Sequence, residues 1–447
     1  MKLSMAAQWT SGELMGRDVE FLGVSTDTRQ IELGNLFVAL RGDNFDGNDF
    51  LEDAARQGAA AAITERDTDA FPGYVRVTDG RRALGLLAAG WFMQFSLPSI
   101  AVTGSAGKTT VKEMLAQMLG GEVLATHGNL NNDIGVPLTL LRAGAEHRYA
   151  VIELGANAPG EIGWTTTLVQ PRVAMVTNVG GAHLEGFGSM RGIAEAKSEI
   201  FRGVPEGGTA VINMDDDWAD FFVERAEKRG LHLVRVGLDG PRDLVARDIV
   251  AEGDGVRFVL VAGELERAVR LPLPGRHQVS NALMALGAIQ ALGLPLEPAL
   301  ERLAGLKSVP GRIHRDACGA GILLDDSYNA SPGSVRAAIE VLAGMPAPRA
   351  LVLGAMAELG AESPALHESL GREARQAGIE QLITVAAEAA QAAKGFGAGA
   401  RALADHDEAV REAWPVLEAG GTVLVKGSRT TRMDRVVEGL RAMGGEH

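Results

Sequence analysis

The sequence has a single cysteine, an excess of acidic over basic residues, and no long apolar run. Cys318 alone excludes an intramolecular disulfide and a cysteine-based zinc site. A formal net charge of −14 argues against a nucleic-acid partner, which would require a basic surface. The longest apolar stretch, Ala83 to Met93, is far shorter than the ~20 residues that cross a bilayer, and the N-terminus does not resemble a secretory signal. We therefore expect a cytoplasmic protein without membrane insertion or nucleic-acid partner.

The chain is long enough for about three domains of ~150 residues each. Apolar runs alternate with helical patterns, and 57 glycines suit many tight turns between strands and helices. We predict an α/β protein with a small N-terminal α/β domain (1–90), a central P-loop domain with a parallel sheet (91–308) and a doubly wound, Rossmann-like C-terminal domain (309–447).

The stretch around residue 105 carries the strongest chemical signal. A buried strand at Ile100 to Val102 leads into a glycine turn, and an amphipathic helix follows it. Glycines let backbone N–H groups approach a polyphosphate, a helix N-terminus adds unpaired donors, and Lys-Thr supplies a cation and a Mg²⁺-binding hydroxyl. The full P-loop pattern has a glycine where this chain has Val102. The predicted nucleotide-binding residues are Gly104, Ser105, Ala106, Gly107, Lys108, Thr109 and Thr110.

Two further strand ends are predicted beside this turn. The strand at Tyr149 to Ile152 ends in Glu153, and a carboxylate at the carboxyl end of a parallel strand is placed to bind Mg²⁺. The strand at Val173 to Thr177 is followed by a loop that contains His183. A lone histidine is more often structural than a ligand, but its position at a third strand end favours metal contact.

Lys197 lies on the apolar face of a predicted helix, four residues after Ile193 and three before Ile200. A surface lysine whose stem packs on apolar neighbours is the simpler interpretation. An inward lysine near phosphates would instead be a charge partner. If its pKa is lowered by desolvation, its neutral amine could capture CO₂ as a carbamate.

Several polar clusters have two interpretations. Ser25 to Arg29 and Arg41 to Phe50 suit solvated turns, or an anionic-ligand site with Arg29 and Arg41 as phosphate partners. The amide-rich loop after Gly128 is either a turn or a substrate contact. Ser331 and Pro332 suit the start of a helix, whereas the polar residues before them exceed what a cap requires: Asp325, Asp326, Tyr328 and Asn329.

Basic residues gather after the last predicted strand, at Lys426, Arg429, Arg432 and Arg435. In an acidic chain this excess indicates an anion site, and a solvated basic helix face is the alternative.

Taken together, the motifs resemble the Mur ligases, ATP-dependent amide-forming enzymes of peptidoglycan precursor synthesis. The resemblance covers nearly the whole chain and includes T-G-S-A-G-K-T-T, N-L-N-N-D-I-G-V-P-L, E-L-G-A-N, A-H-L-E-G-F-G-S, A-K-S-E-I, H-Q-V-S-N-A, P-G-R, D-D-S-Y-N-A-S-P and K-G-S-R. Y-N-A-S-P and N-L-N-N look like the branch that adds D-alanyl-D-alanine to a UDP-linked muramoyl tripeptide.

The resemblance implies roles for particular residues. Lys108, Glu153, His183 and Lys197 would be catalytic, with Thr109, Glu153, His183 and a carbamylated Lys197 as ligands of two Mg²⁺ ions. ATP would also contact Asn281 at adenine, with Arg312 and Asp326 closing on the nucleotide. The UDP moiety would lie against Ser25, Asp27, Arg29, Phe45 and Asn48. The remaining expected substrate contacts are Asn131, Asn132, Asn329, Ser331, Lys426 and Arg429.

Two positions depart from the family pattern. Family members commonly read G-T-N-G-K-T where this chain has Ser105 and Ala106, and F-D-G-H where it has Asn48. The alternatives are a sister ligase with another amine substrate, folylpolyglutamate synthase included, and a P-loop protein that uses nucleotide only as a switch. We expect a monomer whose domains close about the linker at 306–312 before catalysis.

Overall fold

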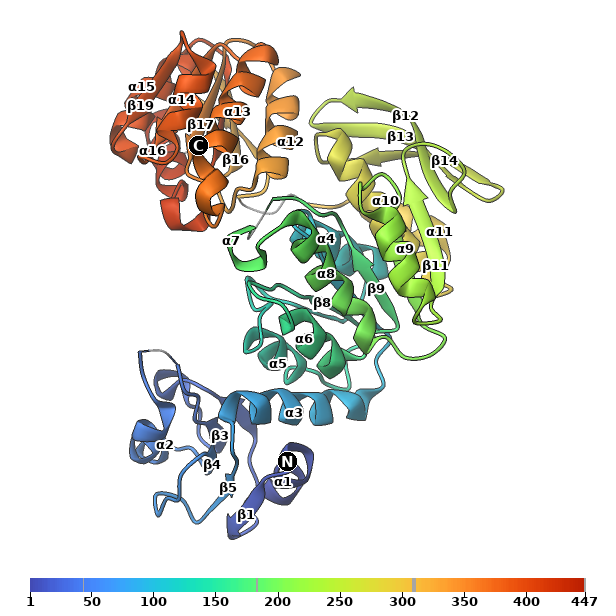
Figure 1. Ribbon diagram of the computed structural model, residues 1–447, viewed down its shortest axis with the longest axis vertical. Helices are drawn as coiled ribbons and strands as arrows, with labels where there is room; N and C mark the ends of the chain where they lie inside the picture. Colours follow the sequence, from blue (N-terminus) through green and yellow to red (C-terminus); the bar gives the residue numbers. More distant parts are fainter. Residues whose placement is uncertain (43, 182–183, 308–310, 446–447) are drawn as a thin grey trace.

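The computed structural model describes residues 1–42, 44–181, 184–307 and 311–445. It contains three sheets, and the three domains built on them follow one another along the long axis of the molecule (Figure 1). The expected α/β fold is confirmed. Helix α3 (Gly80–Phe92) crosses the boundary expected at residue 90 and packs on both the N-terminal and central domains, so it joins the two (Figure 1). No helix in the described part of the chain has the length and apolar character of a membrane span.

The N-terminal sheet has the strand order β1-β5-β4-β3-β2 and is parallel except at β1. Its strands and remaining helices are α1 (Leu3–Thr10), β1 (Glu13–Gly16), β2 (Gly23–Ser25), β3 (Asn35–Val38), α2 (Leu51–Arg56), β4 (Ala61–Thr64) and β5 (Gly73–Arg76). The residue pattern of Val19 to Val24 predicts a strand over that whole stretch, but β2 begins only at Gly23, and no pattern in the sequence predicts β1. β1 is a short antiparallel edge strand that lacks the alternating apolar pattern of a buried one.

The central sheet has nine strands in the order β14-β13-β12-β11-β10-β9-β6-β8-β7. The strands are β6 (Ser99–Thr103), β7 (Val123–Ala125), β8 (Tyr149–Glu153), β9 (Val173–Val176), β10 (Thr209–Asn213), β11 (His232–Gly237), β12 (Leu244–Glu252), β13 (Gly255–Ala262) and β14 (Leu265–Leu271). The last three form antiparallel hairpins, as the mixed residue pattern over Leu244 to Leu271 predicts. β6 lies between β8 and β9, so the strand order reverses there, and ligands of such sheets bind beyond the carboxyl ends at this point.

Helices cover both faces of the central sheet. One face carries α4 (Lys108–Leu119), α10 (Arg276–Ala291) and α11 (Leu296–Leu303), whose apolar residues share one core. The other face carries α5 (Gly135–Leu140), α6 (Glu161–Val169), α8 (Met190–Ser198) and α9 (Ala219–Glu227), and α7 (Leu184–Phe187) lies near the C-terminal domain (Figure 1). This two-sided burial explains the near-continuous apolar runs of the central strands.

The C-terminal sheet has the order β15-β16-β20-β17-β18-β19 and is parallel except for β15. Its elements are β15 (His314–Cys318), β16 (Gly321–Asp326), α12 (Pro332–Ala343), β17 (Arg349–Gly354), α13 (Ser363–Gln376), β18 (Gln381–Val385), α14 (Ala390–Phe396), β19 (Ala400–Leu403), α15 (His406–Glu418), β20 (Thr422–Lys426) and α16 (Asp434–Gly444). The apolar runs at 321–324, 350–353, 381–385 and 422–425 predict the four inner strands, and no such run predicts the edge strands β15 and β19. β15 and β19 are half-exposed and contain charged residues, so they lack an apolar run.

Candidate active site

A cavity of about 750 Å³ lies between the central and C-terminal domains. It is lined from the central domain by Gly104, Ser105, Ala106, Gly107, Lys108, Thr109, Thr110, Asn131, Asn132, Glu153, Lys197 and Asn281, and from the linker and C-terminal domain by Arg312, Asp326, Asn329, Ser331, Lys426 and Arg429. The structure therefore brings together most of the predicted site residues. His183 lies outside the described residues.

The phosphate loop between β6 and α4 leaves no room for side chains at two glycines. A Cβ on Gly104 (φ +150°) would lie 1.8 Å from the Thr177 hydroxyl, and one on Gly107 (φ +82°) would lie 2.5 Å from Asn281 Oδ1. Lys108 opens α4, and its ammonium donates to the Gly104 carbonyl at 2.7 Å. Burial lowers the pKa of Lys108, since the charged form loses solvation there. The loop has the conformation and the cation that a polyphosphate requires.

Asn178 was not predicted, yet it holds this loop. Its Oδ1 accepts from the Ala106 N–H at 3.0 Å, and its Nδ2 donates to the Ala106 carbonyl at 3.1 Å. The neighbouring Ser105 hydroxyl donates to Gly180 O and accepts from Gly180 N–H. The loop after β9 thus supplies an amide beside this turn. The commoner pattern G-T-N-G-K-T has its own amide side chain in the turn, at the position of Ala106. The position of Asn178 just after the strand at Val173 to Val176 was the feature of the sequence that could have identified it.

Glu153, at the end of β8, is fixed by two side chains. Its Oε2 accepts from the Thr109 hydroxyl at 2.8 Å, and its Oε1 accepts from Asn131 Nδ2 at 2.8 Å. Two neighbouring ligands of an octahedral Mg²⁺ are about 3.0 Å apart, because each lies ~2.1 Å from the ion. The hydroxyl and the carboxylate are hard oxygen donors with this spacing, so the pair fits Mg²⁺. Asn132 Oδ1 instead accepts from the N–H of Gly135, the first residue of α5, at 2.8 Å, which supports the turn interpretation for that side chain.

Lys197 points inward from α8, with only 4% of the residue exposed. Burial lowers its pKa well below the usual lysine range, and the charge of Lys108 lowers it further. The expectation that it faces the interior is confirmed, and the snorkelling surface lysine is wrong. Within the described ranges, no three histidine, cysteine or acidic side chains gather closely enough to hold a metal ion by themselves.

The wall near α10 is made of polar groups that already contact one another. Asn281 is buried, donates to Gln278 Oε1 at 2.9 Å and lies against Gly107. Asp215 and Asp216, at the end of β10, also line the cavity and were not predicted. Burial raises the pKa of both carboxyls, and Asp216 accepts backbone N–H groups of Val179 and Trp218. The run of three aspartates, Asp215 to Asp217, after a parallel strand was the signal that could have found them.

On the C-terminal side, Asp326 and Lys426 form a buried ion pair with 2.5 Å between Oδ2 and Nζ. Lys426 also donates to the Asn329 carbonyl at 3.0 Å. Burial raises the pKa of the Asp326 carboxyl, and Lys426 opposes that rise. Ser331 caps α12 together with Ser334, as the simpler interpretation has it.

The basic cluster after β20 is divided between two environments. Lys426 and Arg429 line the cavity, whereas neither Arg432 nor Arg435 is among its lining residues. Arg432 is bound to Asp434 through two parallel contacts. The four cations therefore do not form one anion site.

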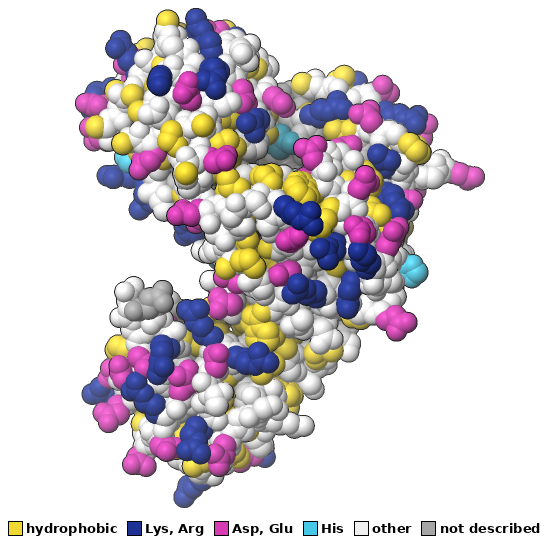
Figure 2. All heavy atoms as spheres, in the orientation of Figure 1, with side chains coloured by type: hydrophobic (Ala, Val, Ile, Leu, Met, Phe, Trp, Pro, Cys, Tyr) yellow, Lys and Arg dark blue, Asp and Glu magenta, His cyan; other side chains and the backbone are white. Residues whose placement is uncertain are grey.

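The residues expected to hold UDP lie in the N-terminal domain and do not line this cavity. Figure 2 shows the surface hollowed between the N-terminal domain and the rest of the molecule. The Ser25 hydroxyl donates to the Asp27 carbonyl, and Asp27 pairs with the exposed Arg29, whose hydrogen bonds hold the pKa of that carboxyl at about 2. Phe45 is 59% exposed.

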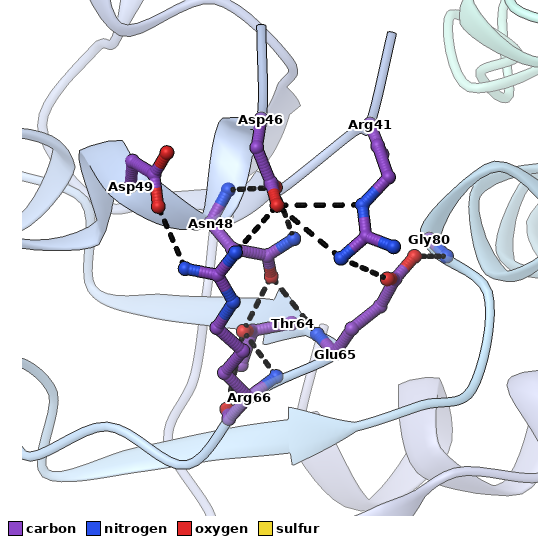
Figure 3. Close-up of polar contacts among 8 residues, drawn as sticks. All are labelled: Arg41, Asp46, Asn48, Asp49, Thr64, Glu65, Arg66 and Gly80. Atoms are coloured by element: carbon purple, nitrogen blue, oxygen red, sulfur yellow. Dashed lines mark hydrogen bonds and ion pairs between the residues drawn. The ribbon is translucent and has the colours of Figure 1, made fainter.

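Asn48 belongs to a polar network in which both its amide oxygen and its amide nitrogen have hydrogen-bond partners (Figure 3). Its Oδ1 accepts from the Thr64 hydroxyl and the Glu65 N–H, and its Nδ2 donates to Asp46 at 2.7 Å. Asp46 also accepts from Arg41 and Arg66. Asn48 is buried, so its amide orders the loop that carries Phe45, and a direct contact with UDP stays a prediction.

Three family models match the chain in succession. They describe the catalytic domain of the Mur ligase family over residues 20–91, the Mur ligase middle domain over 102–289 and the Mur ligase glutamate ligase domain over 311–429. Among curated proteins, the UDP-N-acetylmuramoyl-tripeptide–D-alanyl-D-alanine ligase of Escherichia coli is 43% identical over 99% of this chain and 98% of its own length. The enzyme of the same name from Haemophilus influenzae is 37% identical over 97% of each.

Solved structures agree with the sequence relatives. A crystal structure of MurF from Acinetobacter baumannii superposes with a TM-score of 0.93 at 36% identity and covers 98% of each chain. MurF from Thermotoga maritima in complex with ADP gives a TM-score of 0.86 at 31% identity, over 94% of this chain and 97% of that one. The match extends through all three domains, and the chain therefore belongs to the Mur ligase family.

Proposed function

We propose that this chain is an ATP-dependent ligase that joins D-alanyl-D-alanine to UDP-N-acetylmuramoyl-tripeptide. The observation that carries the proposal is the cavity in which the phosphate loop of the central domain faces Asp326, Lys426 and Arg429 of the C-terminal domain. A protein that uses nucleotide only as a switch would not need the polar residues of the C-terminal domain. The names of the relatives favour this reaction over that of a sister ligase or folylpolyglutamate synthase.

The reaction must turn a carboxylate oxygen into a leaving group. The tripeptide carboxylate attacks the γ-phosphorus of ATP, the bond from that phosphorus to the bridging oxygen breaks, and ADP leaves behind an acyl phosphate. The neutral amine of D-alanyl-D-alanine then attacks the acyl carbon, phosphate departs, and the nitrogen loses a proton. Lys108 offsets the repulsion between carboxylate and triphosphate, which is the main electrostatic barrier to the first step. Arg312 approaches the nucleotide from the linker, and Arg429 binds the dipeptide.

Thr109 and Glu153 are the described residues that would hold Mg²⁺, which supplies charge neutralisation for the transferring phosphoryl group. Lys197 is the proposed carbamate. Its neutral amine forms an N–C bond with CO₂ and releases one proton, which leaves an anion on the same cavity wall as Glu153. The lowered pKa of Lys197, caused first by burial and then by Lys108, supports the neutral amine that this step requires.

The carbamate is tested by ¹³C NMR of the protein equilibrated with ¹³C-bicarbonate. We expect one slowly exchanging carbamate resonance that is absent in Lys197→Met. Lys112→Met is the matched control, because Lys112 is equally buried but donates to Glu113 and the Thr126 carbonyl. A signal that survives in Lys197→Met, or is lost in Lys112→Met, overturns the assignment.

The reaction itself is tested by mass analysis of products from UDP-linked tripeptide, ATP-Mg²⁺ and a panel of amines. We expect a product only with D-alanyl-D-alanine and ADP release that depends on it. ADP release without any amine would indicate a simple nucleotidase. A product with a single amino acid would indicate a sister ligase.

We further propose that the N-terminal domain binds UDP through the loops that contain Ser25 to Arg29 and Phe45 to Asn48. Domain closure about the linker at 306–312 stays a prediction, and residues 308–310 of that linker lie outside the described part of the chain. We propose a monomeric, cytoplasmic enzyme.

A further inference from the structure

Tyr328 contacts two arginines that come from different parts of the chain. The guanidinium carbon of Arg312, in the linker, is 4.6 Å from the centre of the Tyr328 ring. The guanidinium carbon of Arg429, in the loop after β20, is 5.6 Å from the same centre. Both distances are within the ~6 Å at which a cation is attracted to an aromatic face. All three residues line the cavity between the central and C-terminal domains.

Two hydrogen bonds define the arrangement further. The Tyr328 N–H donates to the Gly311 carbonyl at 3.1 Å, which ties the end of the linker to the loop after β16. Gly311 has φ +74°, and a Cβ there would lie 3.1 Å from the Tyr328 Cβ. Arg429 Nη1 donates to the Tyr328 hydroxyl at 3.3 Å. Among the described contacts to Tyr328, that of Arg312 is with the ring, whereas Arg429 contacts both the ring and the hydroxyl.

The two cations have different surroundings. The charge of Arg312 reaches the phosphate loop: burial lowers the pKa of Lys108, Glu153 opposes that change, and Arg312 adds to it. Arg429 is exposed on the C-terminal domain. D-alanyl-D-alanine has a reacting amine and one carboxylate, and a fixed guanidinium is the side chain best suited to bind that carboxylate.

We propose that Tyr328 is a positioning residue that holds Arg312 toward the triphosphate and Arg429 toward the dipeptide carboxylate as one two-armed anion site. The inference rests on the proposed function, which supplies both anions. In this inference, Tyr328 couples the binding of ATP to the binding of D-alanyl-D-alanine, because it contacts the arginine assigned to each. The ring supports both arginines, and the hydroxyl supports only Arg429.

The test measures KM for ATP and for D-alanyl-D-alanine separately in Tyr328→Phe and Tyr328→Leu. Loss of a cation–π contact changes binding by about 2- to 30-fold. We expect Tyr328→Leu to raise both KM values within that range and to alter kcat less. In Tyr328→Phe, which keeps the ring and loses the hydroxyl, the KM for ATP should equal the wild-type value and the KM for D-alanyl-D-alanine should remain raised. Tyr74→Phe, which loses a hydroxyl contact to Asp67 in the N-terminal domain, is the control and changes neither KM.

Arg312→Met and Arg429→Met separate this inference from the proposed function. If Arg312→Met does not raise the KM for ATP and Arg429→Met does not raise the KM for D-alanyl-D-alanine, the assigned roles of the arginines fail. If both do, Tyr328→Leu added to Arg312→Met must give no further rise in the KM for ATP. A multiplicative further rise, unchanged KM values in Tyr328→Leu, or identical behaviour of Tyr328→Phe and Tyr328→Leu overturns the positioning role.

Discussion

The Thr109 hydroxyl donates to Glu153 Oε2 across 2.8 Å, and this contact joins the first turn of α4 to the end of β8. The two residues are 44 positions apart in the chain, and they meet because β6 and β8 are parallel neighbours in the sheet. Parallel strands bring their carboxyl ends to one edge, where a helix N-terminus also begins. The topology therefore places a hydroxyl and a carboxylate where a phosphate-bound cation needs oxygen ligands.

Thr109→Val and Glu153→Gln should each lower kcat by roughly 100-fold or more, because each would remove a proposed Mg²⁺ ligand that supports charge neutralisation in the transition state. The Mg²⁺ concentration for half-maximal rate should rise in both. The measurement is the initial rate against Mg²⁺ concentration at saturating ATP. Thr167→Val, on the exposed side of α6, is the control and should match the wild type. An unchanged Mg²⁺ dependence in both site variants would contradict the assignment.

Asn178→Ala should raise the KM for ATP by about 5- to 30-fold, since two hydrogen bonds to Ala106 are lost at ~1 kcal/mol each. Asn178→Asp keeps the acceptor for the Ala106 N–H, loses the donor and adds a negative charge near the phosphates, so its KM should rise further. The KM for D-alanyl-D-alanine is the internal control. Equal effects on both KM values would show that the whole cavity, and not the phosphate loop, had been disturbed.

Sequence patterns predicted the parts of this site whose chemistry depends on neighbours in the chain. The glycine turn before Lys108 is one such part, because strand, turn and helix are consecutive. Glu153 is another, since its strand end could be aligned with that turn. The inward direction of Lys197 followed from helical spacing alone. Each of these features is local in sequence or follows from a repeated βα unit.

Features that depend on distant pairing were not predictable in the same way. The amide of Asn178 acts on Ala106, 72 residues away, and nothing in its own loop specifies that partner. The sequence around Asn48 is typical of an exposed turn, yet Asn48 is buried and forms hydrogen bonds with Asp46 and Thr64. The edge strands β1 and β19 form because a neighbouring strand offers a partner, and their own residues show little strand pattern.

His277 should make stability fall as the solution becomes acidic. Burial, with a smaller contribution from the charge of Lys426, lowers its pKa from 6.5 to about 4. The unfolded chain takes up a proton below pH 6.5 while the folded protein does not until about 4, so the folded state loses stability across this interval. At pH 5 the loss is about 2 kcal/mol. The measurement is urea unfolding between pH 4 and 7, followed by tryptophan fluorescence.

In His277→Asn this part of the pH dependence should disappear, because asparagine does not titrate. His232→Asn replaces an exposed histidine of β11 and should keep the wild-type profile. If the free energy of unfolding falls with pH equally in His277→Asn and the wild type, the pKa of His277 is not lowered by folding.

The ion pair of Asp326 and Lys426 should be far more costly to break than to replace. Lys426→Met leaves a buried carboxylate without its partner, and such uncompensated charges cost about 3 to 5 kcal/mol. The double variant Asp326→Leu with Lys426→Met removes both charges and should recover much of that loss. Urea unfolding at pH 7 of the wild type, the single variant and the double variant measures the difference.

The penalty in Lys426→Met should also shrink as the pH falls from 7 to 4. Burial raises the pKa of Asp326, and without Lys426 to oppose the rise the carboxyl takes up a proton more readily. The protonated form carries no charge, so the cost of leaving it buried falls. A loss of stability that is constant over this range would mean that Lys426 acts through its packing and its hydrogen bond to Asn329, and not through the charge of Asp326.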